Sequence, residues 1–277
     1  PAGPIVVSDS AVQTPESILY DPIADIYLVS NINGSPVAKD NNGYISRVSP
    51  EGKILVAKWI AGGVGGVKLD APKGTGLRGD TLFVADISVV RLFNRNTGAP
   101  LGEWAVPGST FLNDIAVGPD GTIYLTDSGL SVDAKGNFGT TGTDAVYRFD
   151  AKGKAITMAK GATLGAPNGV LGDSAGVTVV TNNSGVVFHL DLKTNKRTDL
   201  PKPPQAGLDG VVRLADGSLL VSSWGGSAVY RLAAGGTAYT TVVDSATSPA
   251  DIGYDTKRSR VLIPSFTQNK LTFRDLK

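Results

Sequence analysis

Cysteine is absent from this chain of 277 residues, and histidine occurs once, as His189. Without cysteine there is no disulfide framework, no thiolate metal site and no cysteine nucleophile. The absence does not choose between the cytosol and an oxidising compartment. A metal site in this chain would have to be built almost entirely from oxygen ligands.

An excess of charge is missing as well. The chain has 26 basic and 25 acidic residues, a formal charge of +1, and only 18% of its residues are charged. This balance argues against a nucleic acid or an anionic membrane as partner. No apolar run is long enough for a membrane helix. The glycine-rich segment 61–66 lacks the Gly-Lys-Ser/Thr ending of a phosphate loop. We expect a monomer that contacts neither nucleic acid nor membrane.

The chain begins with Pro1-Ala2-Gly3-Pro4 and has no initiator methionine. Such a start fits a terminus left by processing. We therefore expect an exported bacterial protein, periplasmic or secreted, whose signal has been removed. A cytoplasmic location stays open.

A β-hairpin pattern is what the sequence repeats. In segment 111–129, alternating apolar residues stand on both sides of the turn Pro119-Asp120-Gly121, which is typical of two paired strands. Five further copies of this unit occupy residues 15–29, 72–84, 167–180, 208–221 and 249–263. Six repeats of roughly 40–50 residues with about four strands each predict an all-β, six-bladed propeller of antiparallel blades, in one domain over residues 1–277.

The last repeat has room for only three strands, whereas residues 5–7 form a strand without a hairpin partner. We expect this N-terminal strand to pair with residues 270–274, because that pairing closes the ring and leaves no open sheet edge between the termini. Three insertions, at 31–43, 61–70 and 128–143, fall at the same end of the blades. Long glycine-rich loops on one rim form a binding mouth or a mobile surface loop.

The first strands of the six repeats place polar residues at equivalent positions. The first position holds Glu16, Lys73, Asn113, Asn168, Asp209 and Ala250, and the next holds Ser17, Gly74, Asp114, Gly169, Gly210 and Asp251. In a propeller these positions converge on the central channel. Carboxylate and carboxamide oxygens there suit a hard cation such as Ca²⁺, Mg²⁺ or Mn²⁺. The alternative is that these groups satisfy one another and bound water.

Several short motifs carry a family resemblance across nearly the whole chain. They are Pro15-Glu16, Leu112-Asn113-Asp114, Pro167-Asn168-Gly169-Val170, Leu208-Asp209-Gly210 and the segment 223–231. In these motifs the chain resembles the regucalcin/gluconolactonase (senescence marker protein-like) family, six-bladed propellers related to paraoxonases and squid-type organophosphate hydrolases.

The resemblance implies a divalent cation at the channel mouth, Ca²⁺ first, with Mg²⁺, Mn²⁺ or Zn²⁺ as alternatives. It implies Glu16, Asn168 and Asp209 as ligands, with Asn113 as a further ligand or a substrate contact. It also implies hydrolysis of a lactone or related ester, in which the metal polarises the carbonyl or activates water. Of the two catalytic candidates, Asp209 and Glu16, the former is the expected general base.

The chain also departs from the family pattern. Lys73 occupies the ligand position of the second blade, where it would pair with Glu16 or Asp114, bind an anionic substrate, or serve only as an ion-paired lysine. Phe111 and Leu112 precede Asn113, where sugar-lactone members carry an arginine. This change favours an apolar lactone or ester.

Candidate substrate contacts are Lys73, Asp114, Asp127, Trp224 and Asn31. Asp127, Trp224 and Asn31 stand at the ends of second strands, on the rim where the three insertions fall. A histidine pair of the paraoxonase kind is impossible, and we expect His189 to be structural. The rival class is a non-catalytic propeller that binds a ligand or protein, with a structural metal or none. A synthase-like use of a channel glutamate as base is a third possibility.

Overall fold

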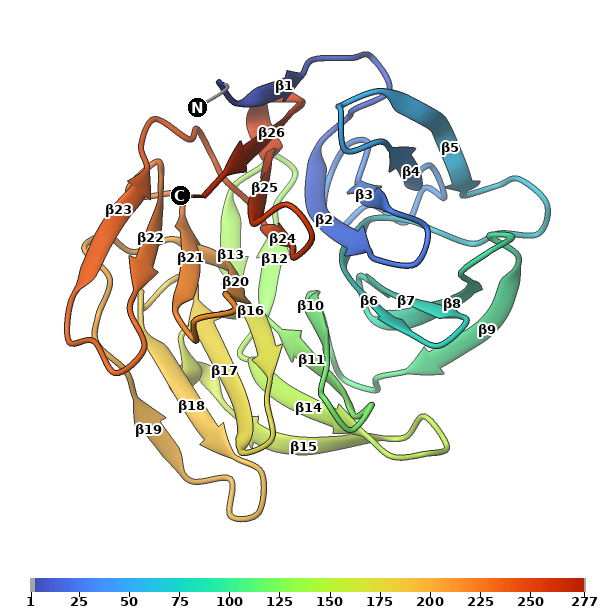
Figure 1. Cartoon of the computed structure of the whole chain (residues 1–277). Helices are drawn as coiled ribbons and strands as arrows, with labels where there is room; N and C mark the ends of the chain where they lie inside the picture. Colours follow the sequence, from blue (N-terminus) through green and yellow to red (C-terminus); the bar gives the residue numbers. More distant parts are fainter. Residues whose placement is uncertain (1–2, 277) are drawn as a thin grey trace.

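The computed structural model describes residues 3–276 and shows six four-stranded antiparallel sheets arranged as the blades of a propeller around one axis (Figure 1). The predicted fold class is therefore confirmed. Two short 3₁₀ turns, η1 (Ala162–Leu164) and η2 (Phe266–Gln268), are the helices of the described part. Neither of them is long or apolar enough to cross a membrane.

In the first five blades the strands follow chain order from the axis outwards. The strands of blades one to three are, in that order, β2 (Pro15–Asp21), β3 (Ile26–Asn31), β4 (Tyr44–Val48) and β5 (Ile54–Ala61); β6 (Pro72–Arg78), β7 (Thr81–Asp86), β8 (Val89–Asn94) and β9 (Pro100–Ala105); β10 (Leu112–Val117), β11 (Ile123–Asp127), β14 (Ala145–Phe149) and β15 (Ala155–Lys160).

Blades four to six continue the pattern, and the sixth takes its outermost strand from the start of the chain. Their strands are β16 (Pro167–Gly172), β17 (Gly176–Thr181), β18 (Val187–Asp191) and β19 (Arg197–Asp199); β20 (Leu208–Arg213), β21 (Leu219–Ser223), β22 (Ala228–Leu232) and β23 (Tyr239–Val243); β24 (Gly253–Asp255), β25 (Arg260–Ser265), β26 (Lys270–Asp275) and β1 (Ile5–Val7).

Two of the insertions pack together at one end of the central channel. The insertion after β11 forms a small hairpin of β12 (Leu130–Val132) and β13 (Phe138–Thr140). Its Leu130 packs with Phe111, Ala166 and Val37, and the last of these belongs to the insertion after β3. The third insertion is tied to the first by a hydrogen bond from the Gly43 amide to the Leu69 carbonyl, 3.1 Å.

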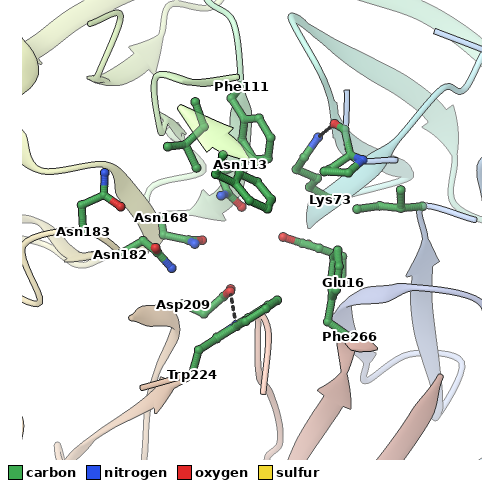
Figure 2. Close-up of a pocket in the computed structure, with 14 residues that line it drawn as sticks. Glu16, Lys73, Phe111, Asn113, Asn168, Asn182, Asn183, Asp209, Trp224 and Phe266 are labelled. Carbon is green, nitrogen blue, oxygen red and sulfur yellow. Dashed lines mark hydrogen bonds between the residues drawn. The ribbon is translucent and has the colours of Figure 1, made fainter. Parts of the chain in front are cut away.

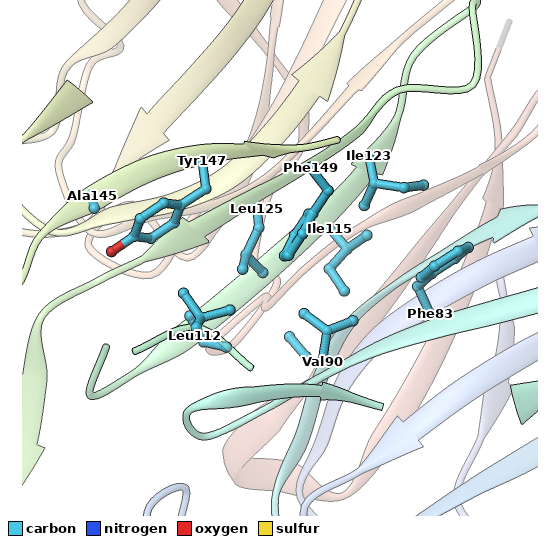
Figure 3. Close-up of a cluster of buried hydrophobic side chains, with 11 residues drawn as sticks. Phe83, Val90, Leu112, Ile115, Ile123, Leu125, Ala145, Tyr147 and Phe149 are labelled. Carbon is cyan, nitrogen blue, oxygen red and sulfur yellow. The ribbon is translucent and has the colours of Figure 1, made fainter. Parts of the chain in front are cut away.

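The core lies between neighbouring blades rather than in one central mass. One cluster, drawn in Figure 3, joins blades two and three through buried side chains such as Phe83, Val90, Ile115 and Phe149. At its outer edge the Trp104 ring lies 5.1 Å from Phe83 and 5.0 Å from Phe149, centroid to centroid. Because each blade buries both of its faces in this way, the ring of blades stays rigid around the channel.

The N-terminal strand closes the ring as the sequence predicts, and β1 lies beside β26 (Figure 1). Strand β1 pairs antiparallel with β26 in the register Ile5↔Phe273, Val6↔Thr272 and Val7↔Leu271. Alternation along the strand sends Val7, 6% exposed, into the cluster with Phe273, whereas Val6 is 55% exposed.

We predict that Val7→Asp lowers the free energy of unfolding by about 3 kcal/mol, because it buries an unpaired charge at the closure. The matched variant Val6→Asp, one residue away on the solvent face, should cost about 1 kcal/mol or less. Urea unfolding monitored by tryptophan fluorescence gives both values. Equal losses in the two variants would contradict the role given to this strand.

Candidate functional site

A bulge at the start of five of the six inner strands directs one residue toward the axis. In blades one to five the pairing of the inner strand with the second strand shifts directly after its first residue, as between Pro15 and Ser17 or between Leu208 and Val211. A bulge leaves one residue outside the ladder and re-aims its side chain. The second residues of these five strands are Glu16, Lys73, Asn113, Asn168 and Asp209.

Four of these side chains converge in one pocket of about 240 Å³ (Figure 2). Each is 3–4% exposed, and each presents one buried oxygen that has no hydrogen-bond partner within the described residues. These atoms are Glu16 Oε2, Asn113 Oδ1, Asn168 Oδ1 and Asp209 Oδ1, and we call them the oxygen cluster. Buried acceptors are nearly always satisfied in folded proteins, so four orphans in one place indicate a missing partner.

The direction of the Asn113 amide follows from its neighbours. The Ser128 hydroxyl donates to the Pro167 carbonyl, 2.6 Å, so its one proton is in use. It therefore accepts from Asn113 Nδ2, 2.9 Å away. With the nitrogen held on that side, Oδ1 of Asn113 faces the pocket.

Asp209 is held by an indole. Trp224, directly after β21, donates its Nε1–H to Asp209 Oδ2 over 2.8 Å. The other carboxylate oxygen belongs to the oxygen cluster. This arrangement fixes the plane of the carboxylate while leaving one oxygen free for chemistry.

Burial and mutual repulsion raise the pKa values of the carboxyl groups that surround the channel. Burial raises the pKa of Glu16 well above its usual range, and the nearby Asp209 and Asp251 carboxylates add to the rise. Burial likewise raises the pKa of Asp209, against the lowering effect of the Trp224 hydrogen bond. One layer below, burial raises the pKa of Asp114 and brings that of Asp251 to about 7. Two ionised carboxylates in the oxygen cluster therefore require a cation.

Lys73, the fifth of the bulge residues, lines the same pocket but does not join the cluster. The sequence left open an ion pair with Glu16 or Asp114. Instead, Nζ donates to two main-chain carbonyls, Pro36 at 2.9 Å and Ala71 at 3.2 Å. Burial lowers the pKa of Lys73 to about 8.

The rest of the pocket is mainly apolar, and apart from Trp224, a predicted substrate contact, sequence reasoning did not single it out. Its other lining residues are Ile32, Pro36, Phe111, Leu130, Phe138, Asn182, Asn183, Trp224 and Phe266. One signal was available for the two asparagines, because Asn182 follows a second strand directly, as Trp224 does. The apolar residues come from insertions and connecting loops, whose positions the repeat pattern does not specify.

Three other candidate contacts lie outside this pocket. Asn31 and Asp127 are fully buried and accept hydrogen bonds from the main chain that leads into their own blade's first strand. Asp127 does so from Phe111 N at 2.9 Å and from Thr110 N at 3.2 Å. Asp114 lines a second cavity of about 450 Å³ at the opposite end of the channel, with Oδ2 accepting from Val170 N at 2.7 Å.

The single histidine is far from this chemistry. His189 lies on β18, the third strand of blade four, with Nδ1 3.4 Å from the Thr178 hydroxyl. Within residues 3–276 no group of three His, Cys, Asp or Glu side chains could hold a metal ion. A cation at the oxygen cluster would therefore need the carboxamide oxygens of Asn113 and Asn168 beside the two carboxylates.

Comparison with known proteins adds a family and a fold. A model of the SMP-30/Gluconolactonase/LRE-like region matches residues 75–259. No curated protein matches the chain by sequence.

Among solved structures, a gluconolactonase from Xanthomonas campestris has a TM-score of 0.68 at 16% identity, over 100% of this chain and 96% of its own. A luciferin-regenerating enzyme scores 0.72 at 13% identity over 99% and 96% of the two chains. Virginiamycin B lyase from Staphylococcus aureus scores 0.64 at 14% identity over 99% of each. Identities this low establish the fold alone, since one propeller supports different chemistries.

The raised carboxyl pKa values predict that the metal-free protein is more stable at pH 5 than at pH 8. Between about pH 4 and pH 7 the folded protein keeps the Asp251 proton, whereas the unfolded chain has released it, so stability falls as the pH rises. One pKa unit is about 1.4 kcal/mol, and 1 kcal/mol moves the melting temperature of a chain this long by about 2–4 °C. We expect a fall of about 5 °C or more.

Differential scanning calorimetry in EDTA from pH 5 to pH 8 measures this slope. The control is Asp251→Asn, which cannot titrate and should have a flatter profile. Carboxylates with lowered pKa values, such as Asp25, release their protons below this window and leave the slope unchanged. A melting temperature that rises toward pH 8 would refute the prediction.

Proposed function

The chain belongs to the SMP-30/gluconolactonase/LRE-like family, and from this premise we propose that it hydrolyses small lactones or related esters with the help of one divalent cation at the oxygen cluster. The observation that carries the proposal is the set of four orphaned oxygens in the pocket. An unsatisfied buried acceptor costs about 1–3 kcal/mol, and more when it is charged. A ligand that bonds to all four oxygens recovers this free energy.

The donor set fits a hard cation. Two carboxylates and two carboxamides supply oxygen only, which suits Ca²⁺ before any softer metal. Four protein oxygens are fewer than the six to eight that Ca²⁺ usually takes, which leaves room for oxygens of water and substrate. A cation bound there supplies counter-charge to the carboxylates and a Lewis acid for a carbonyl oxygen.

We assign the proton transfer to Asp209. Its Oδ2 is held by Trp224, so Oδ1 keeps one direction into the pocket. A water oxygen attacks the acyl carbon while the water proton passes to Oδ1 of Asp209. The acyl carbon–oxygen bond then breaks, and the departing alkoxide takes the proton back. The products are a carboxylic acid and an alcohol, joined in one hydroxy acid when the substrate is a lactone.

The walls of the pocket favour compact, partly apolar substrates. Its 240 Å³ is below the 300–1,000 Å³ typical of drug-sized ligand sites. Phe111 and Phe138 line it as one aromatic pair, and Phe266 lines it as another pair with Trp224. We therefore favour small lactones and aryl esters over polyhydroxylated sugar lactones.

The test compares Asp209→Asn with Asp216→Asn, a matched change in the exposed turn of the same blade, where the carboxylate bonds Arg231. We expect Asp209→Asn to lower kcat/KM for δ-valerolactone and p-nitrophenyl acetate by about 100-fold or more, since a positioned base contributes about 10²–10⁴-fold. Asp216→Asn should leave it unchanged. Asn168→Ala should lose both activity and bound metal.

Elemental analysis and assays with and without EDTA complete the experiment. Full activity in both Asp209→Asn and Asn168→Ala would refute the assignment of the site. No turnover across a broad lactone and ester panel, with a melting temperature that still rises on adding Ca²⁺, would favour a non-catalytic binding propeller instead.

A further inference from the structure

Lys73 is a buried cation in the pocket wall that the proposed hydrolysis leaves unused. It is 1% exposed and extends from the bulge of β6 into the wall between the insertion after β3 and Phe111 (Figure 2). Its Nζ lies 4.5 Å from the centroid of the Phe111 ring. Two carbonyls and an aromatic face hold the ammonium in one place.

No carboxylate in the described part of the chain contacts this charge, although Glu16 lines the same pocket. Within residues 3–276 Lys73 forms no ion pair, and the acidic side chains that act on it from a distance, besides Glu16, are Asp86 and Asp127. Asp86 is bound to Arg91 at 3.0 Å and to the main-chain amide of Ala71 at 2.8 Å. Asp127 is occupied by main-chain amides. A buried charge without a counter-ion is costly, so an anionic ligand here gains more than a neutral one.

The hydrogen-bond count leaves one donor free. A lysine ammonium has three N–H groups. Those of Lys73 that point to Pro36 and Ala71 account for two of them. The third is available to the pocket that the side chain lines. An N–H of a charged group to a carboxylate oxygen is about twice as strong as a neutral hydrogen bond.

We propose that Lys73 anchors a carboxylate that the substrate carries away from its scissile bond, so that the pocket selects lactones and esters bearing an acidic group. This inference rests on the proposed function for the reaction, but the anchoring itself is a binding event. The oxygen cluster, from blades one, three, four and five, would hold the cation that polarises the reacting carbonyl. Lys73, from blade two, engages the remote carboxylate. Specificity thus depends on a residue that takes no part in the proton transfer.

The experiment uses two lactones that differ only in charge, 5-oxotetrahydrofuran-2-carboxylic acid and its primary amide. For the wild-type protein we expect kcat/KM to favour the acid by about tenfold or more, the value of one hydrogen bond to a charged group. Lys73→Met should abolish this preference, mainly by raising KM for the acid. Lys39→Met, an exposed lysine on the neighbouring insertion, is the matched control and should keep the preference.

A second measurement separates this inference from the hydrolase proposal. Isothermal titration calorimetry with glutarate, which cannot be hydrolysed, should show binding to the wild type and to Lys39→Met, and at least tenfold weaker binding to Lys73→Met at an unchanged fold by circular dichroism. That result supports the anchor even when no lactone is turned over. Equal kcat/KM for acid and amide in the wild type, or equal losses for both in Lys73→Met, would overturn it.

Discussion

Six inner strands crowd around one axis, and the space between their backbones controls which residues can stand beside it. A Cβ atom at Gly169 would lie 2.3 Å from the Asp209 carbonyl oxygen, and one at Gly210 would lie 2.3 Å from Ile252 N. At Gly74 it would lie 2.4 Å from Asp114 Cα. The position after each site residue is therefore limited to glycine in three blades. This close approach brings four side chains from four blades into one pocket of 240 Å³.

Much of this could be predicted from the sequence because the determinants are local and repeated. Turn residues and period-2 apolar patterns fix the hairpins, and the six copies fix the number of blades. The same repetition aligns Glu16, Asn113, Asn168 and Asp209 in the sequence, and the structure brings all four together. Ring closure by residues 5–7 followed from an unpaired strand and a short last repeat, and the family model confirms the resemblance seen in the motifs.

The sequence could not predict the conformations of the loops or the hydrogen-bond partners of several polar side chains. Asn31 and Asp127 end second strands on the correct rim, but each turns to the main-chain amides entering its own blade, and Asp86 does the same. A side-chain oxygen close to main-chain N–H groups accepts hydrogen bonds from them, and no periodic pattern in the sequence predicts this pairing. Lys73 is a similar case, since its carbonyl partner Pro36 belongs to an insertion of irregular backbone.

The pairing of β1 with β26 also has a consequence for how the molecule is made. Val7 and its partner Leu271 are separated by nearly the whole chain, so during synthesis the first strand remains without a partner until the last one has emerged. Contacts this distant in sequence are slow to form because the chain between them must first lose its freedom. Blades one to five can each complete their hydrogen bonding from contiguous sequence, whereas the sixth can be finished only at the end. The pairing of β1 with β26 is thus the one strand pairing within the six blades that spans nearly all of the described residues.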